Sequence, residues 1–79
     1  MNLNKKLLQQ LITSLNTEAE KWSFDEYEAL NEELGISLWI GNGMSFLHVY
    51  KPYEVRFSLL GKMKLYKAIN RCKAKKLLK

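Results

Sequence analysis

Two residues of this 79-residue chain have the chemistry of a nucleophile and its base, since Cys72 is the sole cysteine and His48 the sole histidine. A catalytic pair needs its thiol and imidazole within hydrogen-bond reach. The segment SFLHVYK around His48 has the pattern of a strand, whereas Cys72 follows a helical pattern. These patterns favour a partly buried strand residue and a small residue beside the core. We therefore expect no enzymatic activity and assign no catalytic residue.

Metal and cofactor sites find no matching motif in the sequence. Seven of the eight acids lie between residues 17 and 35, but this stretch lacks the glycine and the ligand spacing of a calcium loop. One histidine and one cysteine fall short of the four ligands that zinc prefers. The segment Gly41-Asn42-Gly43 is too short for a phosphate-binding loop. We expect no metal and no cofactor.

The clearest chemical signal is a row of cations near the C-terminus. Their spacing of three and four residues places them within an arc of about 120° on a helix. We call them the basic ridge: Lys64, Lys67, Arg71, Lys75 and Lys79. Like charges at this spacing repel one another, so a ridge without glutamates indicates an anionic counterpart. The candidates are the acidic segment of the chain itself, the phosphates of nucleic acid, and an acidic surface on another protein; the further alternative is that the ridge is simply a solvated helix face.

The charges of the whole chain are segregated along the sequence. Residues 17–35 carry seven acids against one lysine, residues 36–50 carry no charged side chain, and residues 51–79 carry ten cations against one acid. With two further lysines near the N-terminus, the net charge is +5. This separation leaves open whether the acidic segment neutralises the basic ridge within the molecule.

Three segments are predicted to be helices. Residues 3–16 have leucines and an isoleucine at spacings of three and four, which is typical of an amphipathic helix. Residues 23–34 begin with a capping box and are followed by Gly35, which suits a helix end. Residues 59–77 form the basic C-terminal helix, for which Ser58 is the candidate cap. Its expected core stripe is Leu59, Met63, Tyr66, Ile69 and Leu77.

Three segments between the second and third helices are predicted to be strands. These are residues 36–40, 44–51 and 53–58, with an Asn-Gly hairpin turn between the first two. The sequence thus predicts a single α+β domain, residues 1–79, with element order α-α-β-β-β-α and the strands in an antiparallel meander. A chain of this size with 47% hydrophobic residues can form one small core.

Large side chains occur on both faces of the predicted hairpin. Trp39 alternates with Ile36, Leu38 and Ile40 on one strand, and Met44, Phe46 and Tyr50 oppose Leu47 and Val49 on the other. A sheet with one face in water alternates more cleanly. Either helices or a second copy cover both faces, or one face contacts a partner. The candidate anchors of such a contact are Trp39, Phe46, Tyr50 and Tyr53.

These features predict a small non-enzymatic interaction module that binds and modulates, for example inhibits, a larger protein or nucleoprotein complex with an acidic surface. The alternative is a nucleic-acid-binding protein that contacts phosphates through the basic ridge, although the RNP, GxxG, zinc-finger and helix-turn-helix signatures are missing. In size and in lacking catalytic motifs, the chain resembles the small accessory proteins of phages and mobile elements. That resemblance assigns no residue a role.

The sequence also bears on compartment and oligomeric state. A lone cysteine suits a reducing compartment, no signal peptide is recognised, and no apolar run reaches the roughly 20 residues that span a bilayer. We therefore expect a cytoplasmic protein. A membrane-surface role for the basic helix is disfavoured because Tyr66 and Ile69 are expected in the core. A homodimer is compatible with the two-sided apolar hairpin.

Overall fold

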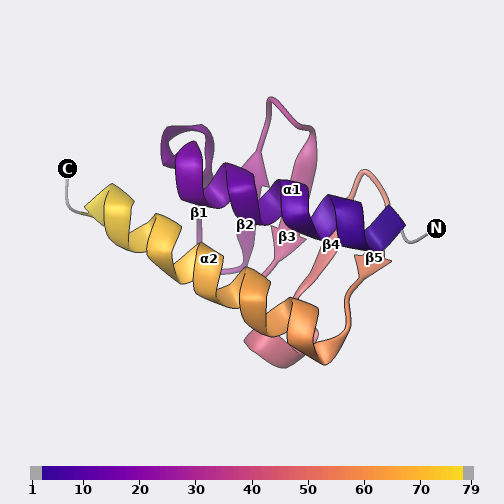
Figure 1. The fold of residues 1–79 in the computed structure, drawn as a ribbon. Coiled ribbons are helices and arrows are strands. Elements are labelled where there is room, and N and C mark those ends of the chain that lie inside the picture. Colours follow the sequence, from indigo (N-terminus) through magenta and orange to yellow (C-terminus); the bar gives the residue numbers. More distant parts are fainter. Residues whose placement is uncertain (1–2, 78–79) are drawn as a thin grey trace.

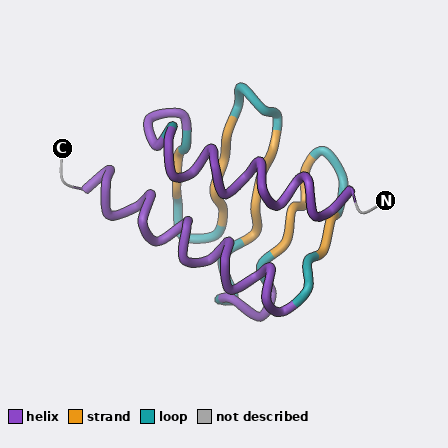
Figure 2. The backbone as a smooth tube through the Cα atoms, in the orientation of Figure 1, coloured by secondary structure: helices purple, strands orange, loops and turns teal. Residues whose placement is uncertain are grey.

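The computed structural model describes residues 3–77, which form two layers (Figure 1). Five short strands make one antiparallel sheet in which each strand pairs with the next in sequence. Helices α1 (Leu3–Thr17) and α2 (Leu59–Leu77) both lie on the same face of this sheet (Figure 2). The expected α+β class is confirmed, but the expected order of three helices and three strands is wrong.

The elements between the two helices are short. A 3₁₀ turn, η1 (Ala19–Lys21), follows α1, and a second one, η2 (Met44–Phe46), links the third strand to the fourth. The strands are β1 (Ser23–Phe24), β2 (Glu28–Asn31), β3 (Ile36–Trp39), β4 (His48–Lys51) and β5 (Val55–Arg56). The edge strands β1 and β5 have two residues each, which protects the sheet from edge-to-edge pairing.

The predicted helix over residues 23–34 is in fact the hairpin of β1 and β2. The Asp25 carboxylate accepts hydrogen bonds from the main-chain N–H groups of Tyr27 and Glu28, each at 2.8 Å, and so closes a turn in place of a helix. Pairing with β3 then holds Glu28–Asn31 extended despite its weak strand propensity. Gly35 has φ of +68°, as a helix end would require, but it lies in the turn between β2 and β3.

The strands β3 to β5 confirm the predicted meander, with shorter elements. The predicted turn at residues 41–43 is present, but the connection from β3 to β4 is longer than predicted, since it spans residues 40–47 and includes η2. Gly43, with φ of +82°, precedes η2 in this connection. The segment 53–58 contributes only Val55 and Arg56 to the sheet.

One cross-strand row runs across the inner face of the sheet. Ala29, Leu38, Val49 and Val55 are direct partners across β2 to β5, and all four are buried. Because side chains alternate along a strand, the neighbouring row must point to the opposite face. The helices cover the inner row with Leu11 and Leu15 of α1 and with residues of α2.

The buried face of α2 differs from the predicted stripe. Leu65, Ala68 and Cys72 are fully buried together with Ile69, whereas Leu59 and Leu77 are 65% and 84% exposed and Met63 is also exposed. At 100° per residue, the buried face lies about 100° from the basic ridge rather than opposite to it. The predicted stripe is right for Ile69, but it left out Leu65 and the small residues Ala68 and Cys72, which face the core.

Gly61 lies where α1 and α2 approach each other closely. Ser58 caps α2 as predicted, since its hydroxyl accepts a hydrogen bond from the Gly61 N–H at 3.1 Å. A Cβ added at Gly61 would lie only 3.1 Å from Cδ2 of Leu8 in α1 and 3.3 Å from Cβ of Phe57. A glycine near the helix start therefore costs helix propensity but permits the contact between α1 and α2.

Candidate interaction surface

The outer face of the sheet carries a second cross-strand row next to the inner one. Glu28, Trp39, His48 and Arg56 are direct partners across β2 to β5. Within residues 3–77 neither helix covers this face, since both lie on the other side (Figure 1). The side chains of this row are an acid, an indole, an imidazole and a guanidinium. Further aromatic residues lie beside the row.

Three aromatic side chains join into what we call the aromatic cluster: Tyr27, Trp39 and Tyr50. The rings of Tyr27 and Trp39 are stacked, with centroids 5.9 Å apart, and Tyr50 meets Trp39 edge to face at 6.5 Å. Gly41 leaves room for the stack, because an added Cβ would lie 2.8 Å from Tyr27 Cδ1 and 3.0 Å from Trp39 Cζ2. Tyr27 remains 54% exposed, while the other two rings are half-buried.

Hydrogen bonding fixes Tyr50 within this cluster. Its hydroxyl donates to the Glu28 carboxylate. This hydrogen bond, with a smaller contribution from burial, raises the pKa of the Tyr50 phenol above its ordinary value. The Lys51 ammonium lies 5.8 Å from the centroid of the same ring. The cluster is thus a positioned group of rings with the Lys51 ammonium at its margin.

Two of the four predicted anchors come together, and two do not. Trp39 and Tyr50 are in ring contact. Phe46 lies in η2 and is 58% exposed, and Tyr53 lies in the turn between β4 and β5 and is 70% exposed. Among the described residues, no ring contact links either of them to Trp39 or Tyr50. Tyr27 was missed because it was placed on a helix; the Asp25 turn signal could have revealed it.

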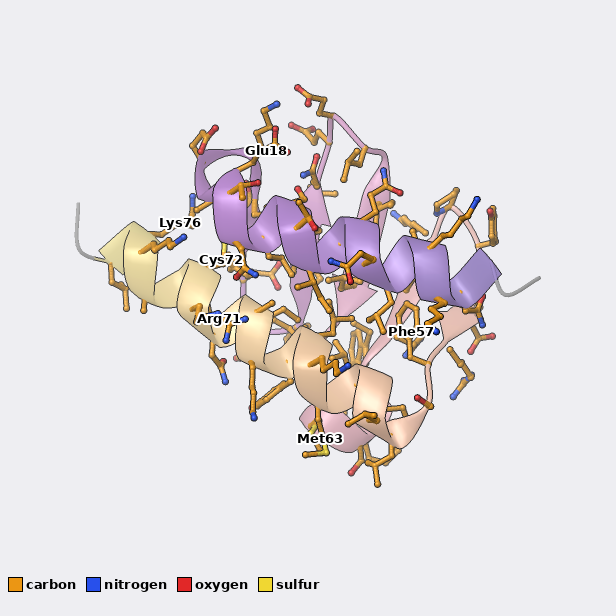
Figure 3. All side chains as sticks on the ribbon, viewed as in Figure 1. Glu18, Phe57, Met63, Arg71, Cys72 and Lys76 are labelled. Carbon is orange, nitrogen blue, oxygen red and sulfur yellow. The ribbon has the colours of Figure 1, made fainter. Side chains whose placement is uncertain are left out.

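The basic ridge is exposed, but its C-terminal half has partners in α1. Lys64, Lys67, Arg71 and Lys75 are all exposed, and Lys79 lies outside the described residues. Arg71 Nε donates to Oδ1 of Asn16 at 3.2 Å, and Lys75 Nζ donates to the Asn16 carbonyl. Figure 3 shows Arg71 and Lys76 on the part of α2 that lies nearest the end of α1.

The acidic segment contributes little to neutralising this ridge. Its ion pairs join Lys21 to Glu18 at 3.1 Å and to Glu33 at 2.8 Å, and these carboxylates hold the pKa of Lys21 above its ordinary value. Glu20 is the acid that shares a small hollow with Lys75 and Lys76. Among the described residues, no ion pair joins the ridge to an acid. Arg71 and Lys75 of the ridge instead donate hydrogen bonds to the side-chain and main-chain carbonyl oxygens of Asn16 in α1.

The candidate nucleophile and base lie on opposite sides of the sheet. His48 belongs to the outer row, and its Nδ1 lies 2.7 Å from the Phe46 carbonyl. Cys72 lies on the buried face of α2, where burial raises the pKa of its thiol. A Cys–His catalytic pair is therefore not formed.

Over residues 3–77 no three histidine, cysteine or acidic side chains gather as a metal site would need. Neither helix of this part of the chain has the length and apolar character that crossing a bilayer demands. Searches against protein-family models, curated proteins and solved structures found no match to this chain.

Proposed function

We propose that the protein is a non-enzymatic interaction module that binds a larger protein through the outer face of its sheet. The observation that carries this proposal is the aromatic cluster on a face that neither helix covers. Tryptophan, tyrosine and arginine are the residues that most often dominate binding energy at protein interfaces. By occupying a surface of its partner, a small module of this kind modulates the partner without chemistry of its own.

Several features of the face favour a protein over the bases of nucleic acid. The ring of Tyr27 is already stacked on Trp39, so the indole does not offer both of its faces to incoming bases. The Glu28 carboxylate lies within the face and would repel phosphates. A half-buried indole in a cluster whose Tyr50 ring lies near the Lys51 ammonium suits an apolar side chain with an acidic neighbour on the partner.

The test compares variants inside and outside the aromatic cluster. Affinity capture with the wild-type chain in its native host provides a candidate partner, which is then purified and titrated by calorimetry. Trp39→Ala should weaken binding at least about 30-fold, the effect of losing an anchor worth 2 kcal/mol or more. Tyr53→Ala removes a more exposed tyrosine outside the cluster and should change affinity less than about fivefold.

Tyr27→Arg gives a second variant in case Trp39→Ala fails to fold, because Tyr27 is the most exposed member of the cluster. It should also abolish tight binding, with an unchanged circular dichroism spectrum. Undiminished binding by a folded Trp39→Ala or Tyr27→Arg chain would rule the proposal out. Sedimentation of the isolated chain measures its oligomeric state. If the wild-type chain is a dimer and Tyr27→Arg makes it a monomer, a second copy occupies this face.

A further inference from the structure

The fold converts the charge pattern of the sequence into two layers of opposite sign. Helices α1 and α2 together carry nine lysine or arginine residues and no acid, because all eight acids lie within residues 18–54. The segment of sheet and turns between the helices carries only Lys21, Lys51 and Arg56 against those acids. The charged residues of the helix layer are therefore all cations, and both helices lie on one side of the sheet (Figure 1).

The basic ridge divides into two halves with different surroundings. Arg71 and Lys75 donate to Asn16, and Lys76 donates to the Ala19 carbonyl at 3.4 Å. In contrast, Lys64 and Lys67 are exposed and have no hydrogen bond or ion pair with any described residue. The C-terminal half thus makes contacts within the protein. In the N-terminal half, the charges of Lys64 and Lys67 are accessible to a ligand.

A pocket of about 380 Å³ adjoins the N-terminal half of the ridge. Lys5 of α1, Arg56 of β5 and Lys64 of α2 line it, together with Asn4 and Ser58, and no acid takes part in the lining. Arg56 also pairs with Glu54, so its charge is partly compensated. Lys5 and Lys64, from two separate helices, therefore both line this pocket at the seam between α1 and α2, whereas the Arg56 side chain belongs to the outer row of the sheet.

We propose that this surface, formed by Lys5 and Lys64 at the pocket and by Lys67 about one turn further along α2, binds the phosphate backbone of nucleic acid. Lysine is depleted at protein–protein interfaces but is a common contact to phosphate oxygens. An acidic protein partner is therefore the weaker fit to this surface. The helix layer shows no constellation that reads base edges, so binding is independent of sequence.

The salt dependence of binding measures the number of phosphates contacted. A labelled DNA duplex is titrated with the intact protein, and anisotropy is read at salt concentrations from about 50 to 200 mM. Three contacts predict a log–log slope near −2.7, which lowers affinity about 40-fold over this range. Absence of binding at the lowest salt, or a flat dependence, would overturn the proposal.

A matched pair of variants locates the surface. Lys67→Gln and Lys51→Gln each remove one exposed charge, the first from the helix layer and the second from the sheet. Lys67→Gln should weaken binding about 15-fold at 50 mM salt and about fourfold at 200 mM, the effect of one lost phosphate contact. Lys51→Gln should change affinity less than twofold. Equal losses in the two variants would mean that net charge attracts DNA to no defined surface.

Two further probes distinguish other anionic partners. Vesicles containing phosphatidylserine that bind the protein more tightly than DNA does, with the loss again confined to Lys67→Gln, would assign the surface to a membrane and overturn the proposal. Poly-glutamate that competes as well as DNA does, at equal charge, would assign it to acidic polypeptide. Trp39→Ala should leave DNA affinity unchanged, so this inference stands or falls separately from the proposed protein contact.

Discussion

Lys75 of α2 donates a hydrogen bond to the main-chain carbonyl of Asn16, in the last turn of α1. Arg71 contacts the side chain of the same asparagine. Carbonyl groups at a helix C-terminus lack partners within the helix and lie at the negative end of its dipole. Part of the basic ridge therefore stabilises α1, a role that helix spacing alone did not suggest.

This contact predicts different costs for two lysines of the same helix. Lys75→Gln should lower the free energy of unfolding by about 0.5–1 kcal/mol, because it removes a cation from the end of α1. Lys67→Gln removes the same charge from a site without such a contact and should change it by less than about 0.5 kcal/mol. Urea denaturation of both variants makes the comparison, and equal losses would contradict it.

A buried hydrogen bond from Trp22 to Ser14 predicts a larger effect. The indole N–H donates to the Ser14 hydroxyl at 3.0 Å, and both residues are buried. Ser14→Ala should lower the free energy of unfolding by about 1–3 kcal/mol, since it leaves the N–H without an acceptor.

A double-mutant cycle isolates the Trp22–Ser14 pair. Trp22→Phe removes the donor, so adding Ser14→Ala in that background should cost less than about 0.5 kcal/mol. If the two substitutions were simply additive, the hydrogen bond would contribute nothing measurable to stability.

The observed orientation of α2 predicts a contrast between two leucines. Leu65 is fully buried, so Leu65→Ala should cost about 2–5 kcal/mol through lost packing and a cavity. Leu59 is 65% exposed, so Leu59→Ala should cost less than about 0.5 kcal/mol. Thermal or urea unfolding gives both values, and the reverse ranking would favour the stripe predicted from the sequence.

The hydrogen bond between Tyr50 and Glu28 predicts a loss of stability at alkaline pH. The tyrosine phenol has a pKa of about 10 in an unfolded chain. The pKa of Tyr50 is higher in the folded protein. Between these two pKa values the folded state holds more protons than the unfolded state, so the free energy of unfolding falls as pH rises above about 10. Below that pH the contribution is complete.

Glu28→Gln tests this assignment, because it removes the charged acceptor of Tyr50. The pKa of Tyr50 should fall toward its ordinary value, as measured from the phenolate absorbance that Tyr50→Phe abolishes. Glu54→Gln removes a carboxylate that pairs with Arg56 and should leave the Tyr50 titration in place. A Tyr50 titration that Glu28→Gln does not move would exclude Glu28 as the cause.

Sequence patterns predicted the local structure correctly where all the signals in a segment fitted the same secondary structure. The spacing of leucines in α1 and the Ser58 cap of α2 agree with the structure, whereas β3 does not alternate, since Ile36, Ser37 and Leu38 are all buried. They failed where one signal fits two structures. Ser23, Glu26 and Gly35 suit the ends of a helix, but the Asp25 turn and the pairing of β2 with β3 made the same residues a hairpin.

The sequence by itself determined the α+β class, the two terminal helices, a meander between them and the cationic character of α2. Only the tertiary structure decided which face of α2 is buried, that Tyr27 joins Trp39 and Tyr50, and that Arg71 and Lys75 meet the end of α1. The spacing of apolar residues shows which of them share a face of one helix or strand. Which neighbour that face meets depends on packing between elements far apart in the chain, where small residues such as Gly61 and Ala68 allow the closest approach.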